Sequence, residues 1–297
     1  MPMKNKVGME VRANGKINLY LDVLSREESG FHTIKSIMQS VSLCDRAIVS
    51  AARSNATDIR ITCDVPYVPC DERNIAHKAA MKYLMRSGIS AEVNINLQKR
   101  IPVSGGMAGG STDAAAVLTA LNKLLGSALP LDELYKLCAE LGSDIPFCLM
   151  GKTALCEGHG EILTPLENRA KLMLLIVPSS EIVSTPWAYS KLDEMFGDFS
   201  GRDNEAKYMA LTNALANGDA KGVASNIYNI FEDAILPERP IARRSKELML
   251  ENGALNAMMS GSGPTTFGIF ENEEARTVAS NILKENGYYP KIAESMV

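Results

Sequence analysis

The stretch Ile101–Leu118 places four glycines directly before three helix-starting residues and an alanine-rich run. The glycines are Gly105, Gly106, Gly109 and Gly110. Glycine adopts backbone angles that other residues avoid, and it lets the main chain approach a ligand closely. Ser111, Thr112 and Asp113 favour a helix start, and Ala114–Leu118 is rich in helix formers. The segment therefore predicts a glycine-rich loop that leads into a helix N-terminus.

Such a loop suits a phosphate group, because the first N–H groups of a helix are unpaired and the positive end of its dipole faces the ligand. No Gly-Lys-Ser/Thr follows the glycines, so the loop is not a Walker A motif. The glycine spacing and the basic and polar residues before it also exclude the dinucleotide fingerprint. A flexible turn before a core helix is the alternative interpretation. The coincidence of loop, hydroxyl pair and helix favours phosphate binding.

The bulk properties are those of an ordinary globular protein. With 297 residues the chain exceeds the usual size of one domain, so we expect two domains that divide between residues 163 and 170. A composition of 46% hydrophobic and 22% charged residues argues against disorder. The net charge is −4 and the isoelectric point is near 5.6. This acidic balance argues against a nucleic-acid partner.

Cysteine usage and the N-terminus indicate a cytoplasmic protein. The six cysteines form no C-x-x-C pair, and there are only three histidines, so a zinc site is not expected. The N-terminus is short and polar, with no signal peptide, and no long apolar span follows, so no membrane partner is expected. Reduced cysteines in the cytoplasm are the simplest interpretation.

The periodicity of apolar residues predicts a mixture of strands and helices. Strands are expected at 10–23, with an interruption at Asn14-Gly15, and at 31–43, 91–98 and 171–178. A hairpin with a turn near 53–57 is expected at 45–63, and two strands joined by a glycine loop at 260–264 are expected at 256–270. Helices are expected at 74–87, 131–141, 184–196, 204–217, 220–231, 241–252 and 272–287, besides one after the glycine loop and a short one within 142–151. Strands and helices do not alternate steadily, which favours an α+β fold over a doubly wound sheet.

Four short segments stand out together: residues 13–19, the glycine loop, residues 141–147 and residues 259–264. In this order and at this spacing they resemble the GHMP kinase superfamily. The resemblance runs from about Val11 to the last helix. Three further segments, Gly30–His32, Gly158–Leu166 and Val183–Thr185, make the chain similar to the branch of that superfamily whose substrate carries a cytidine diphosphate.

This resemblance implies transfer of the γ-phosphoryl group of ATP to a hydroxyl group of a small-molecule substrate. It implies an N-terminal, ATP-binding domain like the second domain of ribosomal protein S5, over residues 1–165. It also implies a C-terminal, ferredoxin-like GHMP kinase domain over residues 166–297, with the active site in the cleft between the two. The expected cofactors are ATP and Mg²⁺.

Lys16 and Asp144 are the expected catalytic residues. The glycine loop contains no lysine, so the positive charge that stabilises the transferring phosphoryl group has to come from elsewhere, and Lys16 is the best candidate in the matched segments. Asp144 is expected to accept the proton of the substrate hydroxyl. The alternatives are an exposed strand lysine for Lys16 and a helix N-cap for Asp144.

The glycine loop is expected to bind the nucleotide through its main chain. The residues concerned are Pro102, Val103, Ser104, Gly105, Gly106, Met107, Ala108, Gly109, Gly110, Ser111 and Thr112. The hydroxyl groups of Ser111 and Thr112 can reach phosphate oxygens or Mg²⁺. The chain has no clear counterpart of the glutamate that some relatives use for Mg²⁺, so phosphates and water are expected to hold the ion.

Aromatic residues are expected to bind the base, because cytosine offers a π face and an edge of donors and acceptors. Phe31 and Tyr189 match family positions that sandwich the cytosine, and His32 matches the position that hydrogen-bonds its edge. Core packing is the alternative for the two aromatic residues, and a satisfied strand histidine is the alternative for His32. Asn18 is expected either to bind the diphosphate or ribose of the substrate or to face solvent.

A second glycine turn, Ser260–Pro264, contributes Gly261 and Ser262 as weaker candidates for the substrate pocket; its alternative is a plain turn between strands. The chain departs from the family pattern in four places. Ser104 and Ala108 replace glycines, Thr112 replaces a serine, and Asn14-Gly15 replaces Pro-Ala before the lysine. Because the loop replacements are small and threonine keeps the hydroxyl, we expect little loss there.

Two rival functions fit parts of the sequence. One is another small-molecule GHMP kinase, of the homoserine or mevalonate type, but a substrate without a base has no use for Phe31, His32 and Tyr189. The other is a non-catalytic RNA-binding module on the S5-like fold, which predicts a basic face that the acidic composition opposes. The sequence leaves the oligomeric state open, with a homodimer as one option.

Overall fold

The computed structural model describes residues 7–103, 105–199 and 204–297. Their contacts divide the chain into two compact units. The first unit holds residues 7–15, 44–103 and 108–150, and the second holds residues 16–43, 105–107 and 151–297. Neither unit is continuous in sequence, so the two do not coincide with a division between residues 165 and 166. Each unit is described below by itself.

The first unit is a sheet covered by helices. Its strands are parts of β1 (Val7–Arg26) and β2 (His32–Arg53), with β3 (Asp58–Cys63) and β4 (Ala91–Gln98), in the order β3-β4-β2-β1. β2 pairs antiparallel with β4, and β3 pairs parallel with β4. Along β4 every second side chain is buried. This alternation builds one face of a core.

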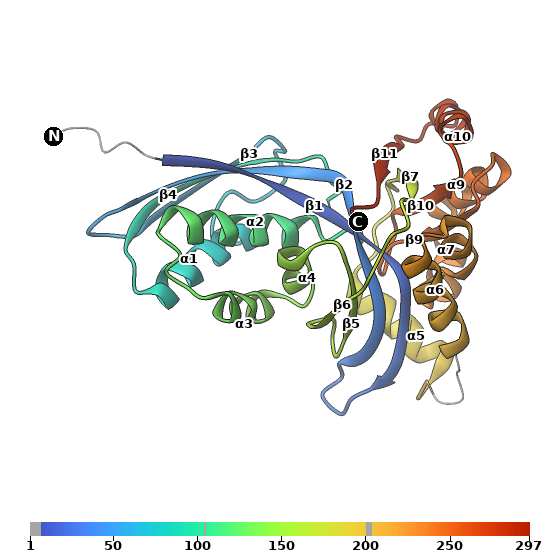
Figure 1. The fold of residues 1–297 in the computed structure, drawn as a ribbon, viewed down its shortest axis with the longest axis horizontal. Helices are drawn as coiled ribbons and strands as arrows, with labels where there is room; N and C mark the ends of the chain where they lie inside the picture. Colours follow the sequence, from blue (N-terminus) through green and yellow to red (C-terminus); the bar gives the residue numbers. More distant parts are fainter. Residues whose placement is uncertain (1–6, 104, 200–203) are drawn as a thin grey trace. The chain divides into compact units, whose positions relative to one another are not determined.

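Four helices complete the first unit: α1 (Ile75–Ser87), α2 (Gly109–Leu124), α3 (Leu131–Leu141) and α4 (Ile145–Met150). Helices α1 and α2 lie against one face of the sheet (Figure 1). The alanines of α2 are buried in the same hydrophobic cluster as the alanines of α1. Small side chains let the two helices approach closely, which explains the alanine-rich run after the glycine loop.

The second unit contains a four-stranded antiparallel sheet with the order β11-β7-β10-β9. Its strands are β7 (Met173–Val177), β9 (Asn256–Met259), β10 (Thr266–Phe270) and β11 (Lys291–Glu294). Helices α9 (Pro240–Glu251) and α10 (Glu273–Glu285) pack on it through Leu248, Met249 and Leu283. The α+β fold class expected from the sequence is confirmed.

The rest of the second unit carries the residues expected to bind substrate. It comprises β5 (Thr153–Glu157), β6 (Ile162–Pro165), α5 (Thr185–Phe196), α6 (Glu205–Asn217), α7 (Ala220–Asn226), β8 (Tyr228–Asn229), α8 (Phe231–Ile235) and a 3₁₀ turn at Leu236–Glu238. β5 pairs with β2 and β6, and β8 pairs parallel with β1. Helices α5 and α8 share a hydrophobic cluster with β1 and β2.

Three local expectations were wrong. β1 runs without a break through Asn14 and Gly15, because strand pairing holds the backbone extended there. The strands expected at 31–43 and from residue 45 onward join into the single strand β2. The helix expected at 220–231 stops at Asn226, because Ile227 is extended (φ −61°, ψ 146°) and β8 then pairs with β1.

Candidate active site

The glycine loop leads into α2 as predicted, and its backbone is specialised. Gly106 and Ala108 both have positive φ angles, +76° and +57°. Helix α2 begins at Gly109, and no side chain caps its N-terminus at Ala108. The first N–H groups of the helix therefore keep the bonding capacity that a phosphate group needs.

The hydroxyl pair of the loop does not lie as expected. Helix α2 starts two residues before Ser111, and Thr112 is buried with its Oγ1 donating to the Gly109 carbonyl at 2.9 Å. Ser111, Thr112 and Asp113 therefore lie inside the helix rather than at its N-cap. Of the nucleotide-binding candidates, Ser104 lies outside the described residues, and the others stay predictions.

A buried charge cluster lies beneath the start of α2. The Lys99 Nζ donates to both Asp45 and Asp113, and it also donates to the Gly109 carbonyl at 3.3 Å. Asp45 additionally accepts from the Arg100 and Ile101 backbone amides. One ammonium thus faces two carboxylates. The basic residues before the loop are evident from the sequence, but their acidic partners are not.

Asp113 is the less well satisfied of the two carboxylates. Its Oδ1 is buried and has no hydrogen-bond partner among the described residues. Burial raises the pKa of Asp113 to about 7; the nearby Asp45 carboxylate adds to this shift, while Lys99 opposes it. The cluster therefore holds an extra proton more readily than an exposed aspartate does.

Asp113→Asn is expected to become more stable relative to the wild type as the pH rises. Because the folded-state pKa of Asp113 is raised, its contribution to stability is fully present below pH 4 and is lost as the pH approaches 7. Urea unfolding at pH 5 and pH 8 measures this. The difference in unfolding free energy should shift by about 1–3 kcal/mol in favour of the variant. A pH-independent difference would contradict the raised pKa.

Lys16 is buried in the second unit, with only 4% of its surface exposed, so the alternative of an exposed strand lysine is wrong. Its Nζ donates to Asn18 Oδ1 at 2.8 Å. The Asn18 Nδ2 donates to Ser36 Oγ at 2.9 Å, and Ser36 Oγ donates to the Tyr20 carbonyl. This chain of hydrogen bonds orients the lysine. Asn18 is buried too, so the alternative that it faces solvent is wrong, and its contact with substrate stays a prediction.

The second glycine turn lies against both the first glycine loop and Lys16. The Ser260 Oγ donates to the Gly106 carbonyl at 3.0 Å, and a Cβ at Gly106 would lie 2.2 Å from the Ser260 carbonyl oxygen. A Cβ at Gly261 would lie 3.4 Å from the Lys16 Nζ. The Lys16 backbone amide in turn donates to the Met107 carbonyl at 3.2 Å. Glycine is required where these main chains meet.

Asn229 holds the second glycine turn, a role that the sequence analysis missed. Its Nδ2 donates to the Met259 and Gly261 carbonyls, each at 2.8 Å, and its Oδ1 accepts from the Phe231 amide. The sequence does not indicate this role, because Asn229 lies in the short segment between α7 and α8, where there is no helical or strand periodicity to interpret. The arrangement adds a rigid support beneath the turn that contacts Lys16.

Phe31 lies on the surface, so core packing is the wrong interpretation for this residue. It is 63% exposed, and its ring stacks on His159 with the ring centroids 5.0 Å apart. The His159 Nε2 lies 2.9 Å from Glu27 Oε1, and this hydrogen bond lowers the pKa of the Glu27 carboxyl. An exposed aromatic face with a backing ring suits stacking of a planar base.

His32 and Tyr189 lie together, as the resemblance implies. Their rings stack at 4.5 Å, and the Tyr189 ring meets Phe231 edge to face at 5.0 Å. His32 is buried and its Nε2 lies 2.7 Å from Asp193 Oδ1, so it has the partner that a satisfied histidine would have. Binding of a base by these residues stays a prediction. Asp193 was not predicted as a partner of His32, although it follows Tyr189 by one helical turn on α5.

Asp144 directly precedes α4, and its carbonyl accepts from the Cys148 amide at 3.1 Å. It therefore occupies the position of a helix N-cap. The hydrogen bond at this position uses the Asp144 main-chain carbonyl. A chemical role for the Asp144 carboxylate is therefore compatible with it. Asp144 belongs to the first unit and Lys16 to the second, and their joint action stays a prediction. Ser262 lies 3.3 Å from the Thr185 hydroxyl, and its contact with substrate also stays a prediction.

The models of a known family match both halves of the chain. The model of the GHMP kinases N terminal domain matches residues 74–152, and the model of the GHMP kinases C terminal domain matches residues 211–288. The chain belongs to the GHMP kinase family. It is a small-molecule kinase.

Similar proteins narrow the family. This GHMP kinase is 41% identical to a 4-diphosphocytidyl-2-C-methyl-D-erythritol kinase of Caldicellulosiruptor saccharolyticus, with 93% of each chain covered. It is 39% identical to one of Clostridium perfringens, with 96% of each covered. A crystal structure of 4-(cytidine 5'-diphospho)-2C-methyl-D-erythritol kinase matches at 30% identity and a TM-score of 0.81, covering 97% of this chain and 100% of that one. A homoserine kinase from Cytophaga hutchinsonii, at 22% identity and a TM-score of 0.73, covers 100% of this chain and 96% of its own, and it shares the fold.

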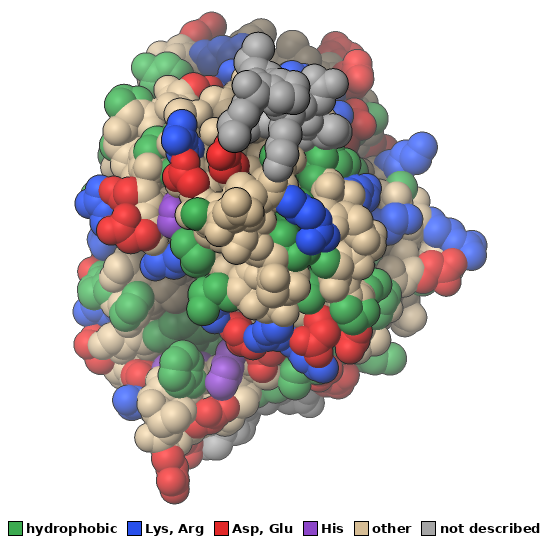
Figure 2. Space-filling view, turned by 90° about the vertical axis from the view of Figure 1, so that its left-hand side faces the viewer, with side chains coloured by type: hydrophobic (Ala, Val, Ile, Leu, Met, Phe, Trp, Pro, Cys, Tyr) green, Lys and Arg blue, Asp and Glu red, His purple; other side chains and the backbone are tan. Residues whose placement is uncertain are grey.

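The surface and composition of this GHMP kinase add four findings. On the face shown in Figure 2, acidic and basic side chains are interspersed and the basic ones do not gather into one patch. Within the described ranges, no helix is long and apolar enough to cross a membrane. No group of three or more acidic, histidine or cysteine side chains in the described part of the chain could hold a metal ion. None of the six cysteines, all of which lie in the described ranges, forms a disulfide bond.

Proposed function

We infer that this chain transfers the γ-phosphoryl group of ATP to the 2-hydroxyl of 4-diphosphocytidyl-2-C-methyl-D-erythritol, a step of non-mevalonate (MEP) isoprenoid precursor biosynthesis. The observation that carries this inference is similarity at about 40% identity, over more than nine-tenths of the chain, to kinases of that name. Because the sequence identity extends over both domains, the simplest conclusion is that this chain acts on the same substrate as those kinases.

Phosphoryl transfer requires positioning and charge neutralisation more than covalent chemistry. The main chain from Gly105 to Thr112 is proposed to hold the phosphates, because α2 begins without a side-chain cap. Lys16 is proposed to stabilise the charge on the transferring group, since its ammonium is buried and oriented by Asn18. Asp144 is proposed to accept the hydroxyl proton.

We propose that Mg²⁺ arrives with the nucleotide, held mainly by phosphates and water. Mg²⁺ commonly keeps several waters and binds through substrate phosphates. When bound, the ion would neutralise charge on the phosphate oxygens. The protein contributes the shape of the glycine loop and the charge of Lys16.

We propose that Phe31, His32 and Tyr189 bind the cytosine of the substrate. The exposure of Phe31 and the stacking of His32 on Tyr189 support a site for a planar base. Asn18, Gly261 and Ser262 remain weaker candidates for the rest of the substrate. A cytoplasmic location and a homodimer also stay predictions, and light scattering after size-exclusion chromatography measures the oligomeric state.

A substrate panel tests this function. We expect ATP-dependent ADP release with 4-diphosphocytidyl-2-C-methyl-D-erythritol, and release with homoserine or mevalonate that is lower by at least about 10³-fold in kcat/KM, because neither offers a base to the aromatic residues. A no-acceptor reaction is the control for ATP hydrolysis. Turnover of homoserine or mevalonate without turnover of the cytidyl substrate would overturn the assignment.

A further inference from the structure

His32, the first residue of β2, is held in one orientation by its surroundings. Its ring stacks on Tyr189 with an interplanar angle of 24°, and it meets the Phe199 ring edge-on at 5.7 Å. Its Nε2 lies 2.7 Å from Asp193 Oδ1, and only 5% of its side chain is exposed. The imidazole therefore has little freedom to rotate or flip.

The contact with Asp193 decides which ring nitrogen carries the proton. A carboxylate accepts hydrogen bonds and does not donate them, so the Nε2 of His32 donates to Asp193. In a neutral imidazole the other nitrogen, Nδ1, is then an acceptor. No hydrogen bond joins Nδ1 to a residue in the described part of the chain. Among the described residues, Nδ1 thus has no hydrogen-bond partner that a ligand would have to displace.

Asp193 has a second partner on its other oxygen. Arg26 Nη1 lies 3.4 Å from Asp193 Oδ2. The carboxylate therefore contacts His32 through Oδ1 and Arg26 through Oδ2.

We propose that Asp193 is a positioning residue that fixes the Nε2–H tautomer of His32, so that Nδ1 accepts a hydrogen bond from the exocyclic amine of cytosine and the site rejects uracil. The proposal rests on the proposed function, which supplies the cytidyl substrate. Cytosine presents an amino group where uracil presents a carbonyl oxygen. In a complex with uracil, the carbonyl oxygen would face the Nδ1 lone pair of His32. Both atoms are acceptors, so neither would have a hydrogen-bond donor.

Asp193→Asn tests the proposal, because it retains the shape of the side chain and can reverse the tautomer. Arg26 only donates, so it favours the amide oxygen on its side and turns the amide NH₂ toward His32. The imidazole must then accept at Nε2 and carry its proton on Nδ1, as an aspartate-to-asparagine change does in the serine-protease triad. The readout is kcat/KM at pH 8 for the cytidyl substrate and for its uridyl analogue.

The wild type is expected to prefer the cytidyl substrate by about 100-fold or more. In Asp193→Asn this ratio should fall at least about tenfold, with the loss on the cytidyl substrate and none on the uridyl analogue. Glu194→Gln is the matched control, because it removes the next carboxylate along α5, whose partner is Lys191 and not His32. Its ratio should equal that of the wild type.

Nitrogen NMR of the wild type gives a second readout that needs no variant. The chain has three histidines, so their ring nitrogens can be assigned. We expect His32 to carry its proton on Nε2 at pH 8. A proton on Nδ1, or on both nitrogens, would overturn the proposal even if Asp193→Asn fails to fold.

The outcomes separate this proposal from the function on which it rests. A wild type that acts on neither cytidyl nor uridyl substrate defeats the proposed function. A wild type that prefers the cytidyl substrate, with an Asp193→Asn variant that loses the same factor on both substrates, leaves the function intact and shows that Asp193 only supports the fold.

Discussion

Lys16→Ala is expected to lower kcat by about 10²–10³-fold, the cost of removing one preorganised group that stabilises transition-state charge. The Lys16 ammonium is buried and held by Asn18, beside the second glycine turn. Because it acts on charge that develops during transfer, the KM for ATP should change much less than kcat. Steady-state kinetics at saturating concentrations of both substrates measures the loss.

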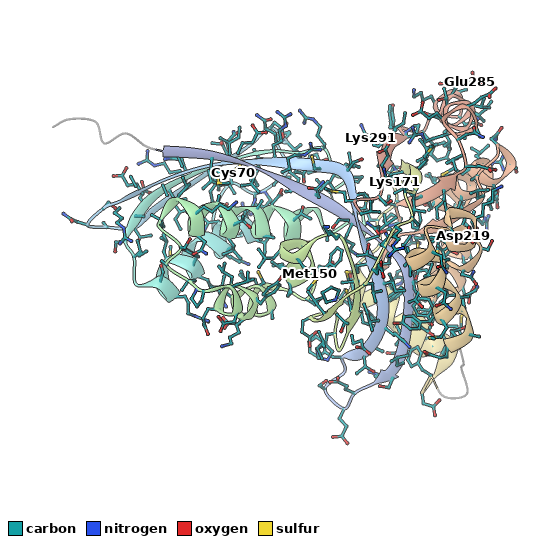
Figure 3. The ribbon with its side chains drawn as sticks, viewed as in Figure 1. Cys70, Met150, Lys171, Asp219, Glu285 and Lys291 are labelled. Carbon is teal, nitrogen blue, oxygen red and sulfur yellow. The ribbon has the colours of Figure 1, made fainter. Side chains whose placement is uncertain are left out.

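Lys171→Ala is the matched control for this prediction. Lys171 also belongs to the second unit and is exposed just before β7 (Figure 3). Its removal should leave kcat unchanged, because an exposed lysine contributes little to the site. If Lys16→Ala unfolds at the wild-type temperature and retains kcat within threefold, the catalytic assignment of Lys16 has to be withdrawn.

Gly106→Ala is expected to reduce kcat/KM by about 100-fold, since a displacement of about 1 Å in a positioned group can cost that much. The new Cβ would lie 2.2 Å from the Ser260 carbonyl oxygen, and the position also has a φ angle of +76°. The glycine loop must therefore move away from the second turn, and the KM for ATP should rise. Activity and thermal unfolding are measured together.

Gly287→Ala is the control that separates the effect of backbone strain from the effect of the steric clash with Ser260. Gly287 has a similar φ angle, +83°, but nothing lies within 4 Å of a Cβ built there. Both variants should lose about 1–2 kcal/mol of stability from backbone strain, and only Gly106→Ala should lose activity. Equal activity in the two variants would show that the contact between Gly106 and Ser260 does not position the loop.

The sequence predicted those parts of the fold that local patterns control. Alternating apolar residues located β4, and helical periodicity over 131–141 located α3. The α+β class followed from the order of strands and helices. The pairing of β8 with β1 could not be predicted, because two residues of strand between helices leave no periodic signal and depend on a partner about 200 residues away.

The candidate site was predictable where a residue type by itself implies chemistry. The glycine loop is an example, whereas Lys16 was chosen because it lies in a segment that resembles the GHMP kinases. Asp193, Asn229 and the cluster around Lys99 were missed, because each acts through a side chain that is distant in sequence. Their types, an acid on a helix, an amide and a basic residue after a strand, are common on protein surfaces. Only tertiary structure shows their partners.

The fate of the γ-phosphoryl group tests the central claim most directly. Phosphorus NMR of a reaction with ATP, Mg²⁺ and 4-diphosphocytidyl-2-C-methyl-D-erythritol should show one new phosphate ester on the methylerythritol carbon skeleton for each ADP formed. Production of ADP and inorganic phosphate without that ester, or no consumption of ATP by the folded protein, would contradict the claim.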